Sequence, residues 1–128
     1  NTCIFIPLFL FHDMDLLNYL QKAFDVYGVS GETKKKFVDW YVKSENQYAS
    51  LERVIYEASI DDRKIRRLFD ELVNAKVMEE NIDENTRTPV PEIFEHPDHG
   101  TINTPGYRFE SKYFEILRNQ ETLAKILQ

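Results

Sequence analysis

Residues 49–80, ASLERVIYEASIDDRKIRRLFDELVNAKVMEE, carry the pattern that decides the fold. Ser50 is a good N-cap for a short helix that ends near Ala58, and Asp61 is placed to cap a longer helix. The apolar residues of the second helix recur at i, i+3, i+4, i+7 and i+8, as a buried helical face requires: Ile65, Leu68, Phe69, Leu72 and Val73. The alternating residues that follow predict a strand over residues 76–82. The stretch therefore predicts a short helix, a tight turn, a longer helix and a strand.

Two further helices are predicted before this stretch. Apolar residues from Asp15 onward follow the helical period and predict a helix over residues 15–27, with Gly28 at its C-terminal cap. A second helix is predicted over residues 32–45, in which one face carries Phe37, Trp40 and Tyr41. Its first turn is basic and contains Lys34, Lys35 and Lys36.

The C-terminal part is predicted to hold a long loop, one strand and one helix. Residues 83–105 contain four prolines and one glycine, which favour a loop. A strand over residues 107–110 pairs with the strand over residues 76–82 to make one hairpin. A final helix is predicted over residues 111–127. We thus expect a mainly α fold with a small β-hairpin.

The N-terminal residues differ in composition from the rest of the chain. Residues 4–11 form an apolar run of eight, well short of the roughly 20 residues that span a bilayer. We interpret residues 1–13 as an appendage, either a cloning scar or translated sequence upstream of a start at Met14, and residues 14–128 as one domain. The alternative is a segment that packs on the domain or on a partner, since eight exposed apolar residues would favour aggregation.

Length and composition describe a soluble globular domain. The chain has 128 residues, 42% of them hydrophobic, which suits one domain and excludes a large multi-domain enzyme. Its net charge of −6 counts against a protein that coats nucleic acid by charge alone. A single cysteine, Cys3, cannot form an internal disulfide and favours a reducing compartment. We expect a cytoplasmic or nucleoid-associated protein.

The central stretch resembles the helix-turn-helix of winged-helix regulators, and its continuation resembles the MarR-like and PadR-like groups. The resemblance spans about residues 33–117. The features that carry it are Ser50-Leu51-Glu52, Ile60-Asp61, Arg63 to Arg67, Leu72 to Val77, and Gly106 to Lys112. Lys76 stands where a glycine is common, so the second helix is expected to end with different geometry. The fold implied is a winged helix-turn-helix with added N- and C-terminal helices.

This resemblance implies sequence-specific DNA binding, with the helix that begins at Asp62 in the major groove. A guanidinium fork matches a guanine edge or a phosphate, and several arginines lie opposite the apolar face of that helix. The predicted contact residues are Arg63, Lys64, Arg66, Arg67, Lys34, Lys35, Lys36 and Arg87. The alternative is a charged face that only contacts solvent. As a DNA-binding protein, the chain would be a transcriptional regulator or a replication or partition factor of a plasmid or virus.

Charge is distributed unevenly along the motif. Residues 33–67 contain nine basic and six acidic residues, whereas residues 78–100 contain one basic residue, Arg87, and seven acidic ones. The resulting net charges are +3 and −6. Phosphates repel an acidic wing. The second hypothesis is therefore a winged helix used as a protein-interaction module, with the acidic wing as the contact.

The end helices are expected to make a homodimer. Their apolar faces exceed what the small central motif can cover, and similar helices in winged-helix regulators form a twofold dimer that suits a palindromic site. The predicted interface residues are Leu16, Leu20, Phe24, Tyr113, Ile116, Leu123 and Leu127.

Other chemistry has little support in the sequence. His96, Asp98 and His99 are three metal-ligand types within four residues, but no fourth ligand accompanies them. No pair of carboxylates stands out as general acid and base, and the chain has no glycine-rich phosphate loop. We expect no enzymatic activity, no cofactor and no metal.

Overall fold

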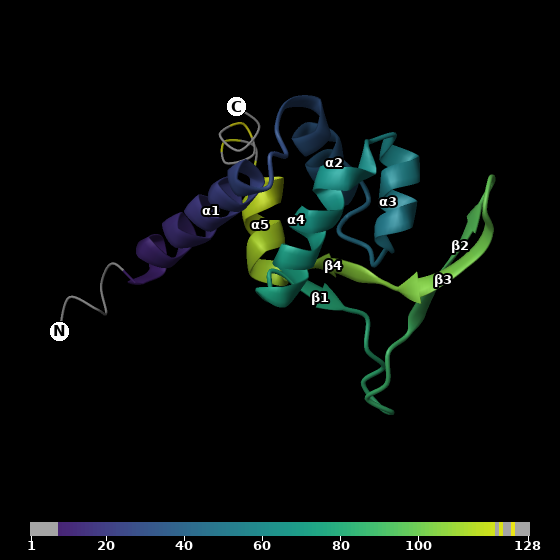
Figure 1. Cartoon of the computed structure of the whole chain (residues 1–128). Coiled ribbons are helices and arrows are strands. Elements are labelled where there is room, and N and C mark those ends of the chain that lie inside the picture. Colours follow the sequence, from purple (N-terminus) through teal and green to yellow (C-terminus); the bar gives the residue numbers. More distant parts are fainter. Residues whose placement is uncertain (1–7, 120, 122–123, 125–128) are drawn as a thin grey trace.

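A computed structural model of the chain describes residues 8–119, 121 and 124 (Figure 1). The elements of this part are, in chain order, α1 (Leu8–Val26), α2 (Gly31–Lys43), α3 (Leu51–Ala58), α4 (Asp62–Asn74), β1 (Met78–Glu80), β2 (Pro91–His96), β3 (Gly100–Pro105), β4 (Tyr107–Phe109) and α5 (Ser111–Arg118). The expected mainly α fold with a small β-hairpin component is confirmed. Within the described ranges, no helix has both the length and the apolar character that crossing a membrane requires.

Helix α1 begins at Leu8, so the predicted start at Asp15 is wrong. No proline or glycine lies between Leu8 and Tyr27, and nothing in the chain therefore interrupts a helix at Met14. The predicted end is confirmed. Gly28 has a φ of 68°, and the next N–H donates to the Phe24 carbonyl at 2.9 Å, which closes the helix as a glycine cap does.

Helices α3 and α4 begin where their caps predict. The Ser50 hydroxyl accepts a hydrogen bond from the Arg53 N–H at 3.2 Å, and the Asp61 carboxylate accepts one from the Arg63 N–H at 3.1 Å. Each side chain thus satisfies an amide of the first turn that lacks a partner within the helix. Helix α2 ends at Lys43, two residues before the predicted end.

The turn after α4 adopts the conformation expected of a glycine, although a lysine occupies it. Lys76 has a φ of 65°, in the left-handed region that disfavours residues with a Cβ. The following N–H, of Val77, donates to the Leu72 carbonyl at 2.9 Å. The lysine therefore closes α4 in a glycine-like geometry at a conformational cost.

Strands β1 and β4 form the predicted antiparallel pair, with Glu79 opposite Arg108. Beyond β4, Ala49 forms a single bridge with Tyr107, so β4 lies between β1 and the residue that leads into α3. The buried side chain of Asn46 fixes β4 from the end of α2. It donates to the Phe109 carbonyl at 2.8 Å and accepts from the Phe109 N–H at 3.0 Å.

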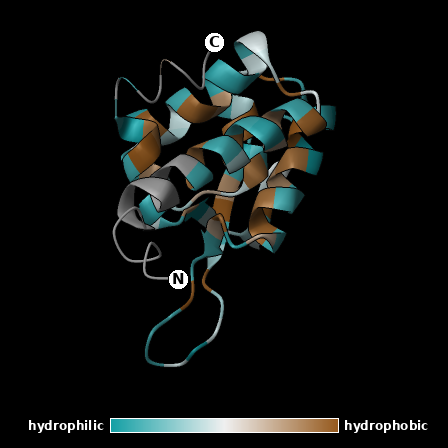
Figure 2. Cartoon of the chain, turned by 90° about the vertical axis from the view of Figure 1, so that its left-hand side faces the viewer, coloured by the Kyte–Doolittle hydropathy of each residue, from teal (hydrophilic) through white to brown (hydrophobic). Residues whose placement is uncertain are grey.

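The predicted loop over residues 83–105 is wrong for most of its length. Strands β2 and β3 pair antiparallel from Pro91 opposite Pro105 to His96 opposite Gly100, and they form the β2–β3 hairpin. Pro91 and Pro105 form the last pair at one end of this ladder, and Pro97 lies in the turn at the other end, so no proline interrupts it. Residues 81–90 form a separate loop, which projects away from the helices (Figure 1 and Figure 2).

The core lies between the helices and β4, with the apolar faces of the helices turned inward (Figure 2). Phe37 and Tyr41 of α2 meet Phe109 of β4 edge to face, with ring centroids 5.0 to 6.0 Å apart. Helix α1 packs against both α4 and α5. The predicted residues Leu123 and Leu127 lie outside the described residues, as do residues 1–7 of the predicted appendage.

Candidate nucleic-acid interface

Helix α4 presents a polar outer ridge because its opposite face is fixed in the core. Its buried residues are Ile65, Leu68, Phe69 and Leu72. Helical periodicity then places four exposed side chains opposite them, which we call the outer ridge: Arg63, Arg67, Asp70 and Asn74. Within the described part of the chain, Arg63 and Arg67 form no ion pair. Both guanidinium groups therefore lie exposed with no carboxylate of the described residues within ion-pair distance.

Arg66 lies on the side of α4 that faces α3, and two carboxylates hold it. Its Nε donates to Asp62 Oδ2 and its Nη1 to Glu52 Oε2, both at 3.2 Å. Partial burial lowers the pKa of Arg66, but the two carboxylates raise it more, so the pKa lies above its ordinary value. Arg66 is thus paired in this structure, unlike Arg63 and Arg67.

The other side of α4 is fixed to α1 through Glu71. The Tyr19 hydroxyl donates to Glu71 Oε2 at 2.8 Å, and the Tyr27 hydroxyl donates to Glu71 Oε1 at 3.1 Å. Lys64 also lies on this side, and its side chain passes next to Gly28 at the end of α1. A Cβ added to Gly28 would lie 3.5 Å from the Lys64 Nζ. Helix α4 is therefore held between α1 and α3, and its outer ridge points away from both.

The Glu71 contacts predict a loss of stability at alkaline pH. Burial, with Glu71 contributing, raises the pKa of Tyr19 above its ordinary value, and the hydrogen bond to Glu71 raises that of Tyr27. Below about pH 10 both tyrosines are protonated in the folded and unfolded states, so their contribution is fully present. Above about pH 10 these tyrosines ionise in the unfolded chain before they ionise in the folded chain, so we expect the free energy of unfolding to fall. Urea titrations at about pH 8.5 and about pH 10.5 measure this change.

Tyr19→Phe provides the matched variant, because it removes the titrating hydroxyl and keeps the ring. We expect this variant to lose less stability than the parent between the two pH values. Equal losses in the two proteins would show that Tyr19 ionises alike in the folded and unfolded chains.

The three predicted lysines of α2 differ in burial and in their contacts. Lys34 is only 8% exposed, with its ammonium 5.7 Å from the centroid of the Phe24 ring, so its assignment to an exposed basic surface is wrong. Lys36 donates to the Ser59 carbonyl at 3.3 Å and lies next to the turn between α3 and α4. Lys35 is exposed.

Arg87 belongs to the loop over residues 81–90, which projects away from the helices (Figure 1). Its N–H donates to the Asp83 carbonyl at 2.8 Å, and its φ of 61° belongs to a tight turn. The N–H groups of Thr86 and Asn85 donate to the Asp83 carboxylate and hold its pKa below the ordinary value. Asp83 therefore keeps its negative charge to a lower pH than an ordinary aspartate does.

The β2–β3 hairpin packs across α3. Arg53 of α3 pairs with Glu92 at 3.0 Å and also lies over the Trp40 ring of α2. Tyr56 of α3 contacts the rings of Phe94 and His96, with centroids 5.9 and 4.9 Å away. The hairpin therefore covers α3 and leaves the outer ridge of α4 open.

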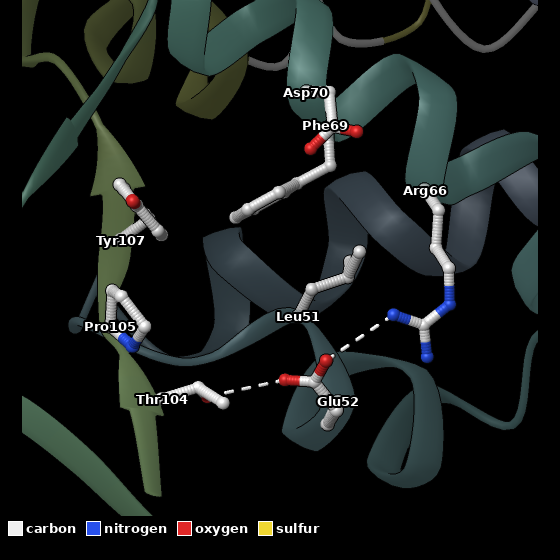
Figure 3. A pocket seen from close by; sticks show the side chains of 8 residues that line it. All are labelled: Leu51, Glu52, Arg66, Phe69, Asp70, Thr104, Pro105 and Tyr107. Carbon is white, nitrogen blue, oxygen red and sulfur yellow. Dashed lines mark hydrogen bonds and ion pairs between the residues drawn. The ribbon is translucent and has the colours of Figure 1, made fainter.

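A shallow pocket of about 290 Å³ separates α4 from β3 and β4 (Figure 3). Glu52 of α3 lies on its floor, where it accepts a hydrogen bond from the Thr104 hydroxyl at 3.2 Å as well as the contact from Arg66. The complete lining is Leu51, Glu52, Arg66, Phe69, Asp70, Thr104, Pro105 and Tyr107. Glu52 thus connects the hairpin to α4.

The predicted dimer residues of α1 belong to this chain's own core. Leu16 is buried, and Leu20 and Phe24 are 0% exposed, so their assignment to an interface between chains is wrong. Tyr113 and Ile116 of α5 are half-buried and pack against the same core. An amphipathic pattern predicts that a face is buried but does not identify what covers it.

His96 lies at the end of β2 and His99 in the turn before β3, and neither carboxylate partner of Arg66 was predicted. His96 and His99 have ring centroids 4.4 Å apart, and the described residues contain no group of three metal-ligand side chains. Glu52 was not predicted as a partner of Arg66, since no local spacing relates the two residues. The i,i+4 spacing of Asp62 and Arg66 was a usable signal for the second carboxylate.

Comparisons with known proteins find no matching family model, no similar curated protein and no similar solved structure. The function therefore has to be inferred from the residues and the geometry of this chain.

Proposed function

We propose that this chain binds duplex DNA through the outer ridge of α4, as a winged helix-turn-helix protein. The observation that carries the proposal is the pair Arg63 and Arg67, one helical turn apart and free of carboxylate partners in the described part of the chain. Unpaired, exposed guanidinium groups retain their donors for phosphates or guanine edges.

The remaining ridge residues are compatible with reading bases. Asn74 offers an amide that can bond adenine at two positions, and Asp70 offers an acceptor for the amino group of cytosine. Four side chains on one exposed helical face thus carry donors and acceptors for the major groove, which is wide enough to admit a helix.

The order of the elements supports the same proposal. A bridging residue, Ala49, precedes α3; α3 and α4 follow as a helix pair; β1 and β4 then pair around an extended hairpin. The succession of α3, a turn, α4, β1 and, further along the chain, β4 is the one that the resemblance to winged-helix regulators implies. In that interpretation α4 is the recognition helix and the β2–β3 hairpin is the wing.

The placement of the acidic residues reduces their conflict with phosphates. Glu92 is paired with Arg53 on α3, and the loop that carries Asp83 and Glu84 projects away from the helices (Figure 1). Most of the negative charge is thus held off the outer ridge, and charges more than about 10 Å apart are largely screened at 0.1 M salt.

A second candidate function is a protein contact made by the β2–β3 hairpin together with the adjoining loop over residues 81–90. Ile93 is 64% exposed on the face of the hairpin turned away from α3, and Ile82 is 43% exposed next to Asp83. Exposed apolar side chains near carboxylates favour a basic partner surface. In the first proposal, DNA binding, the chain would serve as a transcriptional regulator or as a replication or partition factor.

Selection from a pool of random duplexes tests the DNA proposal. We expect recovery of a consensus site whose affinity falls as salt rises, with a log–log slope of about −0.9 for each phosphate contacted. A scrambled duplex of the same length serves as the control for specificity. Failure to enrich any sequence, together with no binding to any duplex at low salt, would overturn the proposal.

A further inference from the structure

Arg66 is held at the junction of α3, α4 and the wing. Its Nη1 donates to Glu52, which lines the pocket in Figure 3 together with Arg66, and its Nε donates to Asp62. Its side chain is 44% exposed, so solvent reaches it. Arg66 follows Arg63 by three residues and directly precedes Arg67.

Glu52 is itself held in place, which makes its pairing with Arg66 persistent. One carboxylate oxygen accepts from the Thr104 hydroxyl and the other from Arg66, and the side chain is only 28% exposed. A carboxylate fixed by the wing loses less side-chain freedom on pairing than one that is free in solvent. Arg66 is thus bound by a preformed acceptor.

We propose that Glu52 is a positioning residue that withholds Arg66 from DNA and thereby limits the affinity of the outer ridge. This inference rests on the proposed DNA-binding function. The Nε and Nη1 groups of Arg66 already donate to Asp62 and Glu52, so a phosphate that approaches Arg66 competes with two carboxylates for this guanidinium. The chain therefore binds with two free arginines instead of three, and more of its affinity comes from the ridge residues that read bases.

Glu52→Gln tests the proposal, because the amide keeps the size and the acceptor for Thr104 but loses one of the two carboxylate charges that hold Arg66. We expect affinity for the selected duplex to rise about threefold to tenfold, and the log–log salt slope to steepen by about one contact. Affinity for scrambled duplexes should rise at least as much, since a released arginine adds a phosphate contact of no sequence preference.

Glu57→Gln is the matched control on the same helix. It removes an equal charge, but Glu57 pairs with Arg53 and Trp40 instead of Arg66. We expect the DNA affinity of Glu57→Gln to rise by less than about twofold, because removing one negative charge from a screened surface has only a small general effect. Thermal unfolding of both variants checks that neither gain arises from a changed fold.

The double variant Glu52→Gln with Arg66→Ala separates release of Arg66 from any other effect of Glu52. We expect it to bind as Arg66→Ala alone binds, and Arg66→Ala alone to stay within about twofold of the parent. Two outcomes would contradict this inference while the proposed function stands, provided that the parent binds DNA. In the first, the DNA affinity of Glu52→Gln rises no more than that of Glu57→Gln. In the second, the affinity rises equally when Arg66 is also replaced. Absence of binding by the parent and by every variant would overturn both.

Discussion

Replacing Arg63 and Arg67 together by alanine is expected to weaken binding to the selected duplex by at least about thirtyfold. Each arginine that contacts a base or phosphate contributes about 1 to 3 kcal/mol, and both are exposed and unpaired on the described surface. Fluorescence anisotropy of a labelled duplex at several salt concentrations measures the loss. Two lost phosphate contacts would also lower the log–log salt slope by about two units, whereas a base contact would relax specificity.

Lys112→Ala with Arg118→Ala is the matched control for charge. These exposed residues of α5 carry the same two positive charges, and Arg118 pairs with Glu115. We expect a change of less than about threefold, because these side chains lie off α4 and contribute only a screened field. If the two double variants lose affinity equally, binding follows net charge, and the outer ridge is not the contact surface.

Asn46→Ala is expected to lower the free energy of unfolding by about 3 kcal/mol, a large effect for a single polar side chain. The Asn46 side chain satisfies both main-chain groups of Phe109 in the core. Alanine would leave that N–H and that carbonyl buried without partners, and each such group costs about 1 to 3 kcal/mol. Urea unfolding followed by circular dichroism measures the change.

Glu45→Ala separates hydrogen bonding from backbone conformation. Glu45 and Asn46 have φ values of 56° and 59°, so alanine is strained to a similar degree at both positions. Glu45 is exposed, and its replacement is expected to cost less than about 1 kcal/mol. Equal losses at the two positions would assign the effect to the left-handed backbone and not to the contacts with Phe109.

The starts of α3 and α4 and the end of α1 could be predicted closely because their signals are local, whereas α5 ends at Arg118 and not at the predicted residue 127. Ser50 and Asp61 cap the helices that follow them, and Gly28 closes α1, all through bonds between residues a few positions apart. The predicted start of α1 was wrong because the composition changes near Met14, whereas the backbone there has no reason to leave the helix.

Burial was predictable, but the partner of each buried face was not. The apolar stripe of α1 correctly identified Leu20 and Phe24 as buried residues. Their placement in a dimer interface was wrong because helical periodicity fixes which face is apolar and leaves open whether the same chain covers it. Here α4 and α5 lie against α1.

Local spacing and alternation in the sequence are sufficient to specify the helix-turn-helix order, the caps and the two pairing strands β1 and β4. Which arginines are free depends instead on contacts between distant parts of the chain. Arg66 pairs with Glu52 across 14 positions, Glu52 binds Thr104 across 52, and Asn46 reaches Phe109 across 63. Such contacts form only once the chain has closed long loops, so no local pattern records them.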